Sequence, residues 1–169
     1  GAQAAFELMV ETDRAAVEGV RRPAGVTVGL HVCRGNQSSM WLGEGDYQPI
    51  AERLFGTVPV DRFLLEYDDD RAGGFEPLKY MPADKIVVLG LVSSKTPALE
   101  AGDALARRIG EAAKFVDLDR LALSPQCGFA SIAEGGNRLT AAEQFAKLRL
   151  VADTARATWG QAVAAAGRT

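Results

Sequence analysis

The segment KIVVLGLV, at residues 85–92, gives the clearest indication of the fold of this chain. Its run of aliphatic and β-branched residues is typical of a strand buried on both faces, as in a parallel sheet. Two similar runs precede it, VTVGLHVC at 26–33 and RFLLEY at 62–67, and a shorter one, LALS at 121–124, follows it. We therefore expect four strands, with 26–33 a well-buried one.

Segments with helical periodicity alternate with these strands. We expect a first amphipathic helix from about Phe6 to Val20, a short helix capped by Asp46, and a third helix that starts at Asp103. The sequence Thr140–Glu143 (TAAE) is a capping box that opens a last helix. The apolar face expected for that last helix consists of Phe145, Leu148, Ala152, Ala155 and Trp159.

Strands that alternate with helices indicate βα units and a parallel sheet. A complete (β/α)₈ barrel takes about 250 residues, whereas this chain has 169 residues and four βα units. The predicted fold class is therefore α/β of the (β/α)₈ TIM-barrel type, with residues 1–169 forming a single domain that supplies about half of the barrel.

Composition limits the classes of function. The formal net charge is −3, which gives no reason to expect nucleic acid or an anionic membrane as a partner. No apolar run approaches the roughly 20 residues that span a bilayer, and no signal-peptide pattern opens the sequence. Two cysteines are too few for a disulfide-framed secreted scaffold, so we expect a cytoplasmic location.

A candidate metal site follows from the scarce residue types. The single histidine, His31, is followed two residues later by Cys33, and residues i and i+2 of a strand point to the same face. Glu66 ends the second strand and Cys127 follows the fourth. The carboxyl ends of parallel strands share one rim, so these four residues can converge there. Two thiolates, an imidazole and a carboxylate suit tetrahedral zinc.

Each of these residues also has a purely structural interpretation. The two cysteines could be inert buried thiols or could form a disulfide. Glu66 could be a solvated charge at a strand end, and Asp68–Asp70 is better explained as a solvated loop than as a second metal site.

Polar residues near the rim are candidates for substrate binding, namely Arg34, Asn36, Ser93 and Ser94. Arg34 could pair with an anionic substrate, and Ser93, Ser94 and Lys95 could bind a carboxylate or phosphate. The structural alternatives are that Arg34 and Asn36 only tie down a turn and that residues 93–95 form an ordinary polar loop.

Four segments resemble the C-terminal catalytic half of the cobalamin-independent methionine synthase family, and most closely its short, single-barrel bacterial members. They are HVCRGN (31–36), FLLEYD (63–68), VVLGLVSSKTP (87–97) and LSPQCGF (123–129). The resemblance implies a zinc ion bound by His31, Cys33, Glu66 and Cys127. It also implies zinc-dependent methyl transfer to a thiol, with homocysteine as acceptor, methionine as product and a methyltetrahydropteroyl compound as donor.

Two departures from the family pattern keep other functions open. The family carries Asp-x-His on the strand before the serine-rich turn, and the aligned residues here are Gly90 and Val92. The sequence has no other histidine that could act as the proton-donating acid in place of the histidine of Asp-x-His. This favours a zinc thiol methyltransferase that uses a corrinoid or sulfonium donor. The upstream half of the family's barrel is also missing from the sequence. We therefore expect that an upstream half or a second chain closes the sheet, and that the isolated chain could be a non-catalytic zinc-binding half-barrel.

Overall fold

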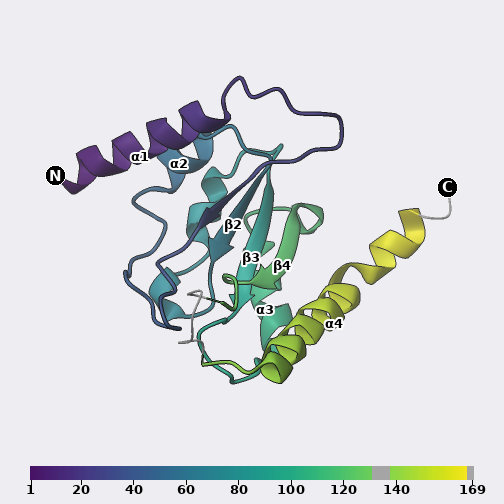
Figure 1. Ribbon diagram of the computed structural model, residues 1–169. Coiled ribbons are helices and arrows are strands. Elements are labelled where there is room, and N and C mark those ends of the chain that lie inside the picture. The colour runs from purple at the N-terminus through teal and green to yellow at the C-terminus, as the bar shows by residue number, and fades with distance from the viewer. Residues whose placement is uncertain (131–137, 167–169) are drawn as a thin grey trace.

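The computed structural model describes residues 1–130 and 138–166, with only the backbone described for 161–166 (Figure 1). Four strands form one sheet: β1 (Gly29–Val32), β2 (Arg62–Glu66), β3 (Ile86–Val92) and β4 (Leu121–Pro125). Their order in the sheet is β1-β2-β3-β4, and each neighbouring pair is parallel. Parallel strands that lie side by side in chain order, joined by helical connections, are the arrangement of a TIM barrel. The predicted fold class is confirmed, and four strands correspond to half of such a barrel.

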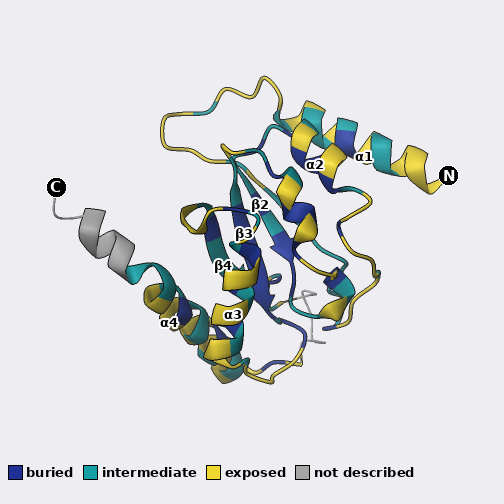
Figure 2. Cartoon of the chain, turned by 180° about the vertical axis from the view of Figure 1, so that it is seen from behind, coloured by how far each residue is buried: buried dark blue, intermediate teal, exposed yellow. Residues whose placement is uncertain are grey.

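Helices pack on one side of this sheet. The α-helices are α1 (Ala2–Val17), α2 (Ala51–Thr57), α3 (Gly102–Ala112) and α4 (Ala141–Ala166), and short 3₁₀ segments are η1 (Asp70–Ala72), η2 (Glu76–Tyr80) and η3 (Leu118–Arg120). Helix α3 lies in front of β3 and β4 in Figure 2 and behind them in Figure 1. Helix α4 packs against β4 and α3, and α1 packs against α2. Among the described elements, no helix crosses the face of the sheet that is turned toward the viewer in Figure 1.

The two faces of the sheet differ in chemistry because alternate residues of a strand point to opposite sides. The helix-covered face supplies the hydrophobic core, which includes Phe63, Leu65, Val87, Leu89 and Leu121. On the other face, the register aligns His31, Leu64, Val88 and Ala122 in one row and Glu66, Gly90 and Ser124 in the next. The candidate metal ligand His31 therefore lies on the face without helices.

The first two elements are shorter than the sequence suggested. Strand β1 covers only residues 29–32, alternates between exposed and half-buried positions, and is an edge strand rather than a well-buried one. Helix α1 ends at Val17, before the predicted Val20. Asp46 does not cap a helix: its carboxylate accepts a hydrogen bond from the Gln48 amide (3.0 Å), and α2 begins only at Ala51.

The capping box of α4 is confirmed, whereas its predicted apolar face is right only toward the C-terminal end, where Trp159 packs against the core. The Thr140 amide donates to Glu143 Oε2 (2.7 Å), and the Glu143 amide donates to Thr140 Oγ1 (3.3 Å). Phe145 and Leu148 are 66% and 44% exposed, whereas Lys147 is completely buried. The Lys147 ammonium donates to the Ala98 carbonyl and to the Glu100 carboxylate in the β3–α3 loop, so α4 turns Lys147 rather than Phe145 toward the protein. Despite its 26 residues, α4 is not apolar enough to span a bilayer, and neither is any other described helix.

Candidate metal centre

Strand β1 positions the first two candidate ligands. His31 lies in the strand and Cys33 directly follows its last residue, so both side chains project from the same face of the sheet. His31 is exposed and Cys33 is half-buried. This placement on the helix-free face agrees with the sequence prediction that both residues can reach one ion.

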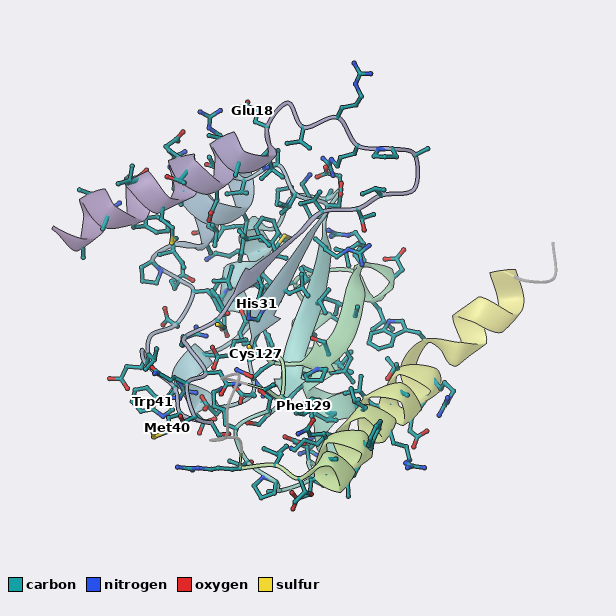
Figure 3. The ribbon with its side chains drawn as sticks, in the orientation of Figure 1. Glu18, His31, Met40, Trp41, Cys127 and Phe129 are labelled. Atoms are coloured by element: carbon teal, nitrogen blue, oxygen red, sulfur yellow. The ribbon has the colours of Figure 1, made fainter. Side chains whose placement is uncertain are left out.

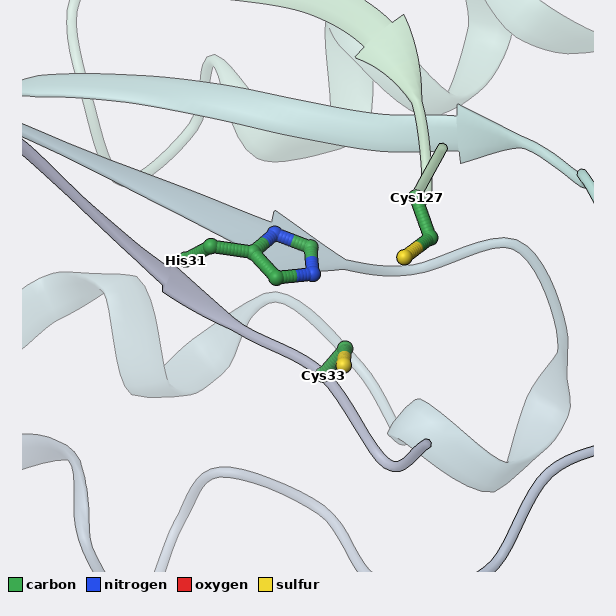
Figure 4. Close-up of side chains that lie close together, drawn as sticks. All are labelled: His31, Cys33 and Cys127. Atoms are coloured by element: carbon green, nitrogen blue, oxygen red, sulfur yellow. The ribbon is translucent and has the colours of Figure 1, made fainter. Parts of the chain in front are cut away.

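Cys127 completes a three-residue cluster from the far side of the sheet. It follows β4, which ends at Pro125, and its side chain points toward His31 and Cys33 (Figure 4). The ligand atoms of the three residues all lie within 4.8 Å of one another. Both cysteines are free thiols, so the disulfide alternative does not describe this structure. Two edge strands that are not neighbours thus bring three ligand-type atoms together.

The donor set of this cluster fits zinc. Solvent reaches the His31 side chain, but the surrounding protein partly desolvates the imidazole and lowers its pKa, an effect that the charge of Glu66 opposes. The imidazole therefore favours its neutral, metal-binding form. Burial raises the pKa of the Cys127 thiol, which is therefore protonated near neutral pH until an ion displaces the proton. Two thiolates and an imidazole are ligands that tetrahedral zinc prefers, and three protein ligands leave a fourth position available.

Glu66, the fourth predicted ligand, is turned toward other partners. Its carboxylate is only 1% exposed. Oε1 accepts a hydrogen bond from the Lys95 ammonium (2.7 Å), and Oε2 accepts one from the Arg34 amide. Burial would raise the pKa of this carboxyl, but the hydrogen bonds from Lys95 and Arg34 outweigh burial and hold its pKa below the ordinary value. Glu66 is therefore an ionised carboxylate beside the cluster, and its role as a ligand stays a prediction.

Arg34 is held by the protein itself. Its guanidinium donates to the carbonyls of Gly45 (2.6 Å) and Glu66 (3.2 Å) and lies over the Tyr47 ring, 4.4 Å from the ring centroid. The side chain is 10% exposed. These contacts support the alternative in which Arg34 ties down the loop after β1.

The amide of Asn36 is also used within the protein. It donates to Ser94 Oγ (3.1 Å) and to the Gly128 carbonyl (3.2 Å). Ser94 is completely buried and donates to Gln126 Oε1 (2.5 Å). Ser93 is half-buried, and its hydroxyl accepts a hydrogen bond from the Lys95 amide (3.2 Å). Substrate binding by Asn36, Ser93 and Ser94 remains a prediction that these contacts do not test.

The acidic loop after β2 is not uniformly solvated, which corrects the sequence interpretation. The Asp68 side chain is 1% exposed and accepts two hydrogen bonds from the Lys95 ammonium (2.9 and 3.1 Å). Asp69 pairs with Arg71 and Asp70 is exposed. Lys95 is thus paired with carboxylates of the protein itself, Glu66 and Asp68, and its binding of a substrate group stays a prediction. Gln126, which is 2% exposed next to Cys127, was not singled out, and its position beside a ligand was the available signal.

A pocket of about 720 Å³ opens beside these residues. It is lined by residues of all four rim loops, including Trp41, Asp68, Ser93, Lys95, Leu99 and Arg138. Figure 3 shows Met40 and Trp41 at the end of the molecule where the strands end, below the position of Cys127. The pocket has the size and the mixture of apolar and charged lining that small-molecule sites usually have.

Gly90 and Val92, which stand where the family carries Asp-x-His, are tightly enclosed at the end of β3. A Cβ at Gly90 would lie 2.8 Å from Gln126 Cα and 2.8 Å from the Leu65 carbonyl oxygen, so this backbone has no room for a side chain there. Val92 is completely buried and belongs to the hydrophobic core. Neither residue carries an acid group, and position 90 has no room for one.

Residues 4–156 match the family described as the catalytic domain of cobalamin-independent synthase, so the chain belongs to this family. It is 52% identical to the protein YxjG of Bacillus subtilis over 139 residues, which cover 82% of this chain and 36% of YxjG. It is 29% identical to a methionine synthase of Pyrococcus abyssi over 121 residues, which cover 72% of this chain and 31% of that protein.

Two solved structures share the fold. A putative vitamin-B12-independent methionine synthase from Listeria monocytogenes superposes with a TM-score of 0.65 at 34% identity and covers 91% of this chain and 41% of its own. A B12-independent methionine synthase from a Shewanella species, solved with selenomethionine, gives a TM-score of 0.71 at 21% identity and covers 94% and 46%. The chain thus spans about a third of the curated relatives' length and less than half of these two structures.

Proposed function

We propose that this chain is the zinc-binding, C-terminal half of a methyltransferase barrel that transfers a methyl group to a thiol, with homocysteine as acceptor and methionine as product. The observation that supports this proposal most directly is the convergence of His31, Cys33 and Cys127, whose ligand atoms lie within 4.8 Å of one another. Membership of the cobalamin-independent synthase family supports the same reaction class.

In this proposal His31, Cys33 and Cys127 hold the ion, and Glu66 is the fourth candidate ligand. Zinc, when bound, stabilises a substrate thiol as the thiolate, which is the nucleophilic form. The two cysteines and Glu66 give the site an excess of negative charge, which keeps a bound sulfur electron-rich. The Asn36–Ser94–Gln126 hydrogen bonds hold the loop that carries Cys127, so this ligand is pre-positioned.

The pocket beside Lys95 and Trp41 is a suitable place for the methyl donor. In the transfer, the bond from the donor to the methyl carbon breaks and the bond from the thiol sulfur to that carbon forms. A pteridine nitrogen that leaves needs a proton. A corrinoid cobalt or a thioether leaves with the electron pair and needs no proton.

Gly90 has no space for a side chain and Val92 is a buried apolar residue, so neither residue can supply this proton. This favours a donor whose leaving group needs no proton. We therefore retain a corrinoid or sulfonium donor as the second candidate. An upstream half-barrel or a partner chain would complete the site beside the open edges of β1 and β4, and without it the isolated chain would bind zinc but not turn over.

The test uses the full-length natural protein loaded with zinc. Methyltetrahydropteroylglutamate, methylcobalamin and S-methylmethionine are offered side by side with homocysteine, and methionine is measured. Cys127→Ser should lose the metal and the methyl transfer, whereas Asp70→Asn, which changes an exposed carboxylate at the same rim, should keep both. Equal, mild effects of the two substitutions would contradict the proposed site.

A further inference from the structure

Two large apolar side chains lie exposed at the wall of the 720 Å³ pocket. Trp41 is 47% exposed and Met40 is 51% exposed, and both residues line the pocket. Exposed apolar surface at the edge of a cavity is typical of a site that binds a ligand. The indole and the thioether are therefore candidates for direct contact with a bound molecule.

A tight turn of unusual backbone geometry presents these two side chains. Gln37 and Met40 exchange two backbone hydrogen bonds of 2.9 Å, which close the turn. Its central residues, Ser38 and Ser39, have φ angles of 51° and 59°, in the left-handed region that residues other than glycine rarely adopt. Backbone held in this region by its surroundings is often found at ligand sites.

Arg71 fixes the orientation of the indole ring. Its guanidinium carbon lies 4.7 Å from the centroid of the Trp41 ring, the geometry of a cation–π contact. The same guanidinium pairs with Asp69 (2.5 Å) and donates to the Gly43 carbonyl (3.2 Å). The ring is thus held against one cation of the protein, while its exposed part stays accessible to a ligand.

Arg138 places a second charged group close to this ring. It is exposed and lines the pocket, and its amide donates to Ser39 Oγ in the turn before Trp41 (3.0 Å). Lys95, the other cation of the lining, is already held by two buried carboxylates. An aromatic ring and a guanidinium therefore lie on two segments that a hydrogen bond joins. Together they suit a ligand with a positive group at one end and a carboxylate at the other.

We propose that Trp41 and Arg138 bind the methyl donor, and that this donor is a sulfonium compound with a carboxylate. The sulfonium lies on the indole ring and the carboxylate on the guanidinium. This inference rests on the proposed methyl transfer and names the class of its donor. Tryptophan attracts cations more strongly than other aromatic side chains, and the thioether of Met40 adds a polarisable contact.

The transfer from such a donor balances without a proton-donating residue. The acceptor reacts as its thiolate, after its proton has passed to solvent. The bond between the donor sulfur and the methyl carbon breaks, and its electron pair stays on the donor sulfur, which becomes a neutral thioether. A lone pair of the thiolate sulfur forms the new bond to the methyl carbon. This agrees with Gly90 and Val92, neither of which carries an acid group.

The experiment measures the binding of two probes to the full-length natural protein by calorimetry. S-Methylmethionine carries a sulfonium and a carboxylate, whereas the trimethylsulfonium ion carries no carboxylate. Trp41→Leu should weaken the binding of both probes about tenfold, and Trp41→Phe, which keeps an aromatic ring, about threefold. Arg138→Gln should weaken S-methylmethionine about tenfold and leave the affinity for trimethylsulfonium unchanged.

Two controls test the positive charge of the ligand and the position of the ring. Homoleucine, which has CH in place of the sulfonium sulfur, should bind more weakly than S-methylmethionine and respond less to Trp41→Leu. Trp159 lies on α4, donates its ring N–H to the Leu118 carbonyl (2.9 Å) and is not among the described residues that line this pocket. Trp159→Phe should therefore leave the affinity for both probes unchanged.

The outcomes separate this inference from the proposed function. Equal S-methylmethionine affinity in the wild type and Trp41→Leu, or no affinity in the wild type, would overturn the inference. Methionine formed from another donor would then leave the proposed function standing. A zinc-loaded wild type that forms no methionine from any donor offered would overturn the proposed function, whatever Trp41 binds. If Arg138→Gln weakens trimethylsulfonium as much as S-methylmethionine, the assigned carboxylate contact is wrong.

Discussion

The hydroxyl of Ser94 donates a hydrogen bond to Oε1 of Gln126 at 2.5 Å, and both side chains are almost completely buried. Ser94 follows β3, and Gln126 immediately precedes Cys127, so this bond joins the loop after one strand to the loop that presents a candidate ligand. Asn36 donates to the same Ser94 oxygen and to the Gly128 carbonyl. The ends of β1, β3 and β4 are thereby held together around the candidate metal centre.

Ser94→Ala should destabilise the protein and weaken metal binding. The substitution leaves the Gln126 carbonyl oxygen buried without its donor, which typically costs about 1–3 kcal/mol. It also loosens the segment that carries Cys127. Urea denaturation and a zinc competition assay measure the two effects. Thr96→Ala changes an exposed hydroxyl in the same loop and should stay within about 0.5 kcal/mol of the wild type. Comparable losses in both variants would mean that the buried hydrogen bonds are unimportant.

Gly90→Ala should be destabilising because the added Cβ would lie 2.8 Å from both Gln126 Cα and the Leu65 carbonyl oxygen. These are backbone atoms, so the sheet itself must move, at a cost of about 1–3 kcal/mol or more. Gly110→Ala is the matched comparison, since a Cβ there has open space on the exposed side of α3. Replacing that helical glycine should stabilise by about 0.5–1 kcal/mol. Thermal unfolding of both variants tests the expectation, which is wrong if the two shifts have the same sign.

The Asp61 carboxylate should make stability depend on pH. It accepts a hydrogen bond from the Val28 amide (2.6 Å) and pairs with Arg22, and these two partners hold its pKa below the ordinary value. A carboxyl whose pKa is lower in the folded state stabilises the protein above its unfolded pKa of about 3.9. That contribution is lost as the pH falls through the lower, folded-state pKa.

Asp61→Asn should therefore be less stable than the wild type at pH 7, and the difference should shrink as the medium becomes acidic. Chemical denaturation across this pH range measures it. Asp119→Asn, at an exposed carboxyl in η3, is the control variant for the loss of one negative charge. A gap between wild type and Asp61→Asn that does not shrink as the medium is made more acidic would count against the assignment.

The 169-residue chain alone should associate or expose apolar surface. Strands β1 and β4 are the two edges of the sheet, and large apolar side chains such as Leu8, Leu42 and Phe145 are more than 60% exposed. If a few hundred Å² of apolar surface stay exposed to water, the folded chain loses several kcal/mol of stability, at about 25 cal/mol per Å². Sedimentation and binding of a hydrophobic dye should differ from those of the full-length protein. A stable, dye-negative monomer would show that the half-barrel is self-sufficient.

The elements that the sequence predicted well depend on local patterns. The strands at 62–67, 85–92 and 121–124 were located within about a residue, because uninterrupted apolar runs specify buried strands. The Thr140–Glu143 capping box formed as expected, since both of its hydrogen bonds join residues three apart. The pairing of His31 with Cys33 on one face follows from the two-residue period of a strand.

The tertiary structure alone decided what depends on distant contacts. Helix α4 buries Lys147 rather than Phe145, and the buried ammonium pairs with Glu100, which lies 47 residues away in the chain. The closeness of Cys127 to His31 depends on the order and twist of four strands. The pairing of Glu66 with Lys95 depends on how two loops meet at the rim. Periodicity specifies which face a side chain occupies, but only the packed fold specifies which partner reaches it, because hydrogen bonds and ion pairs need distances of a few ångströms.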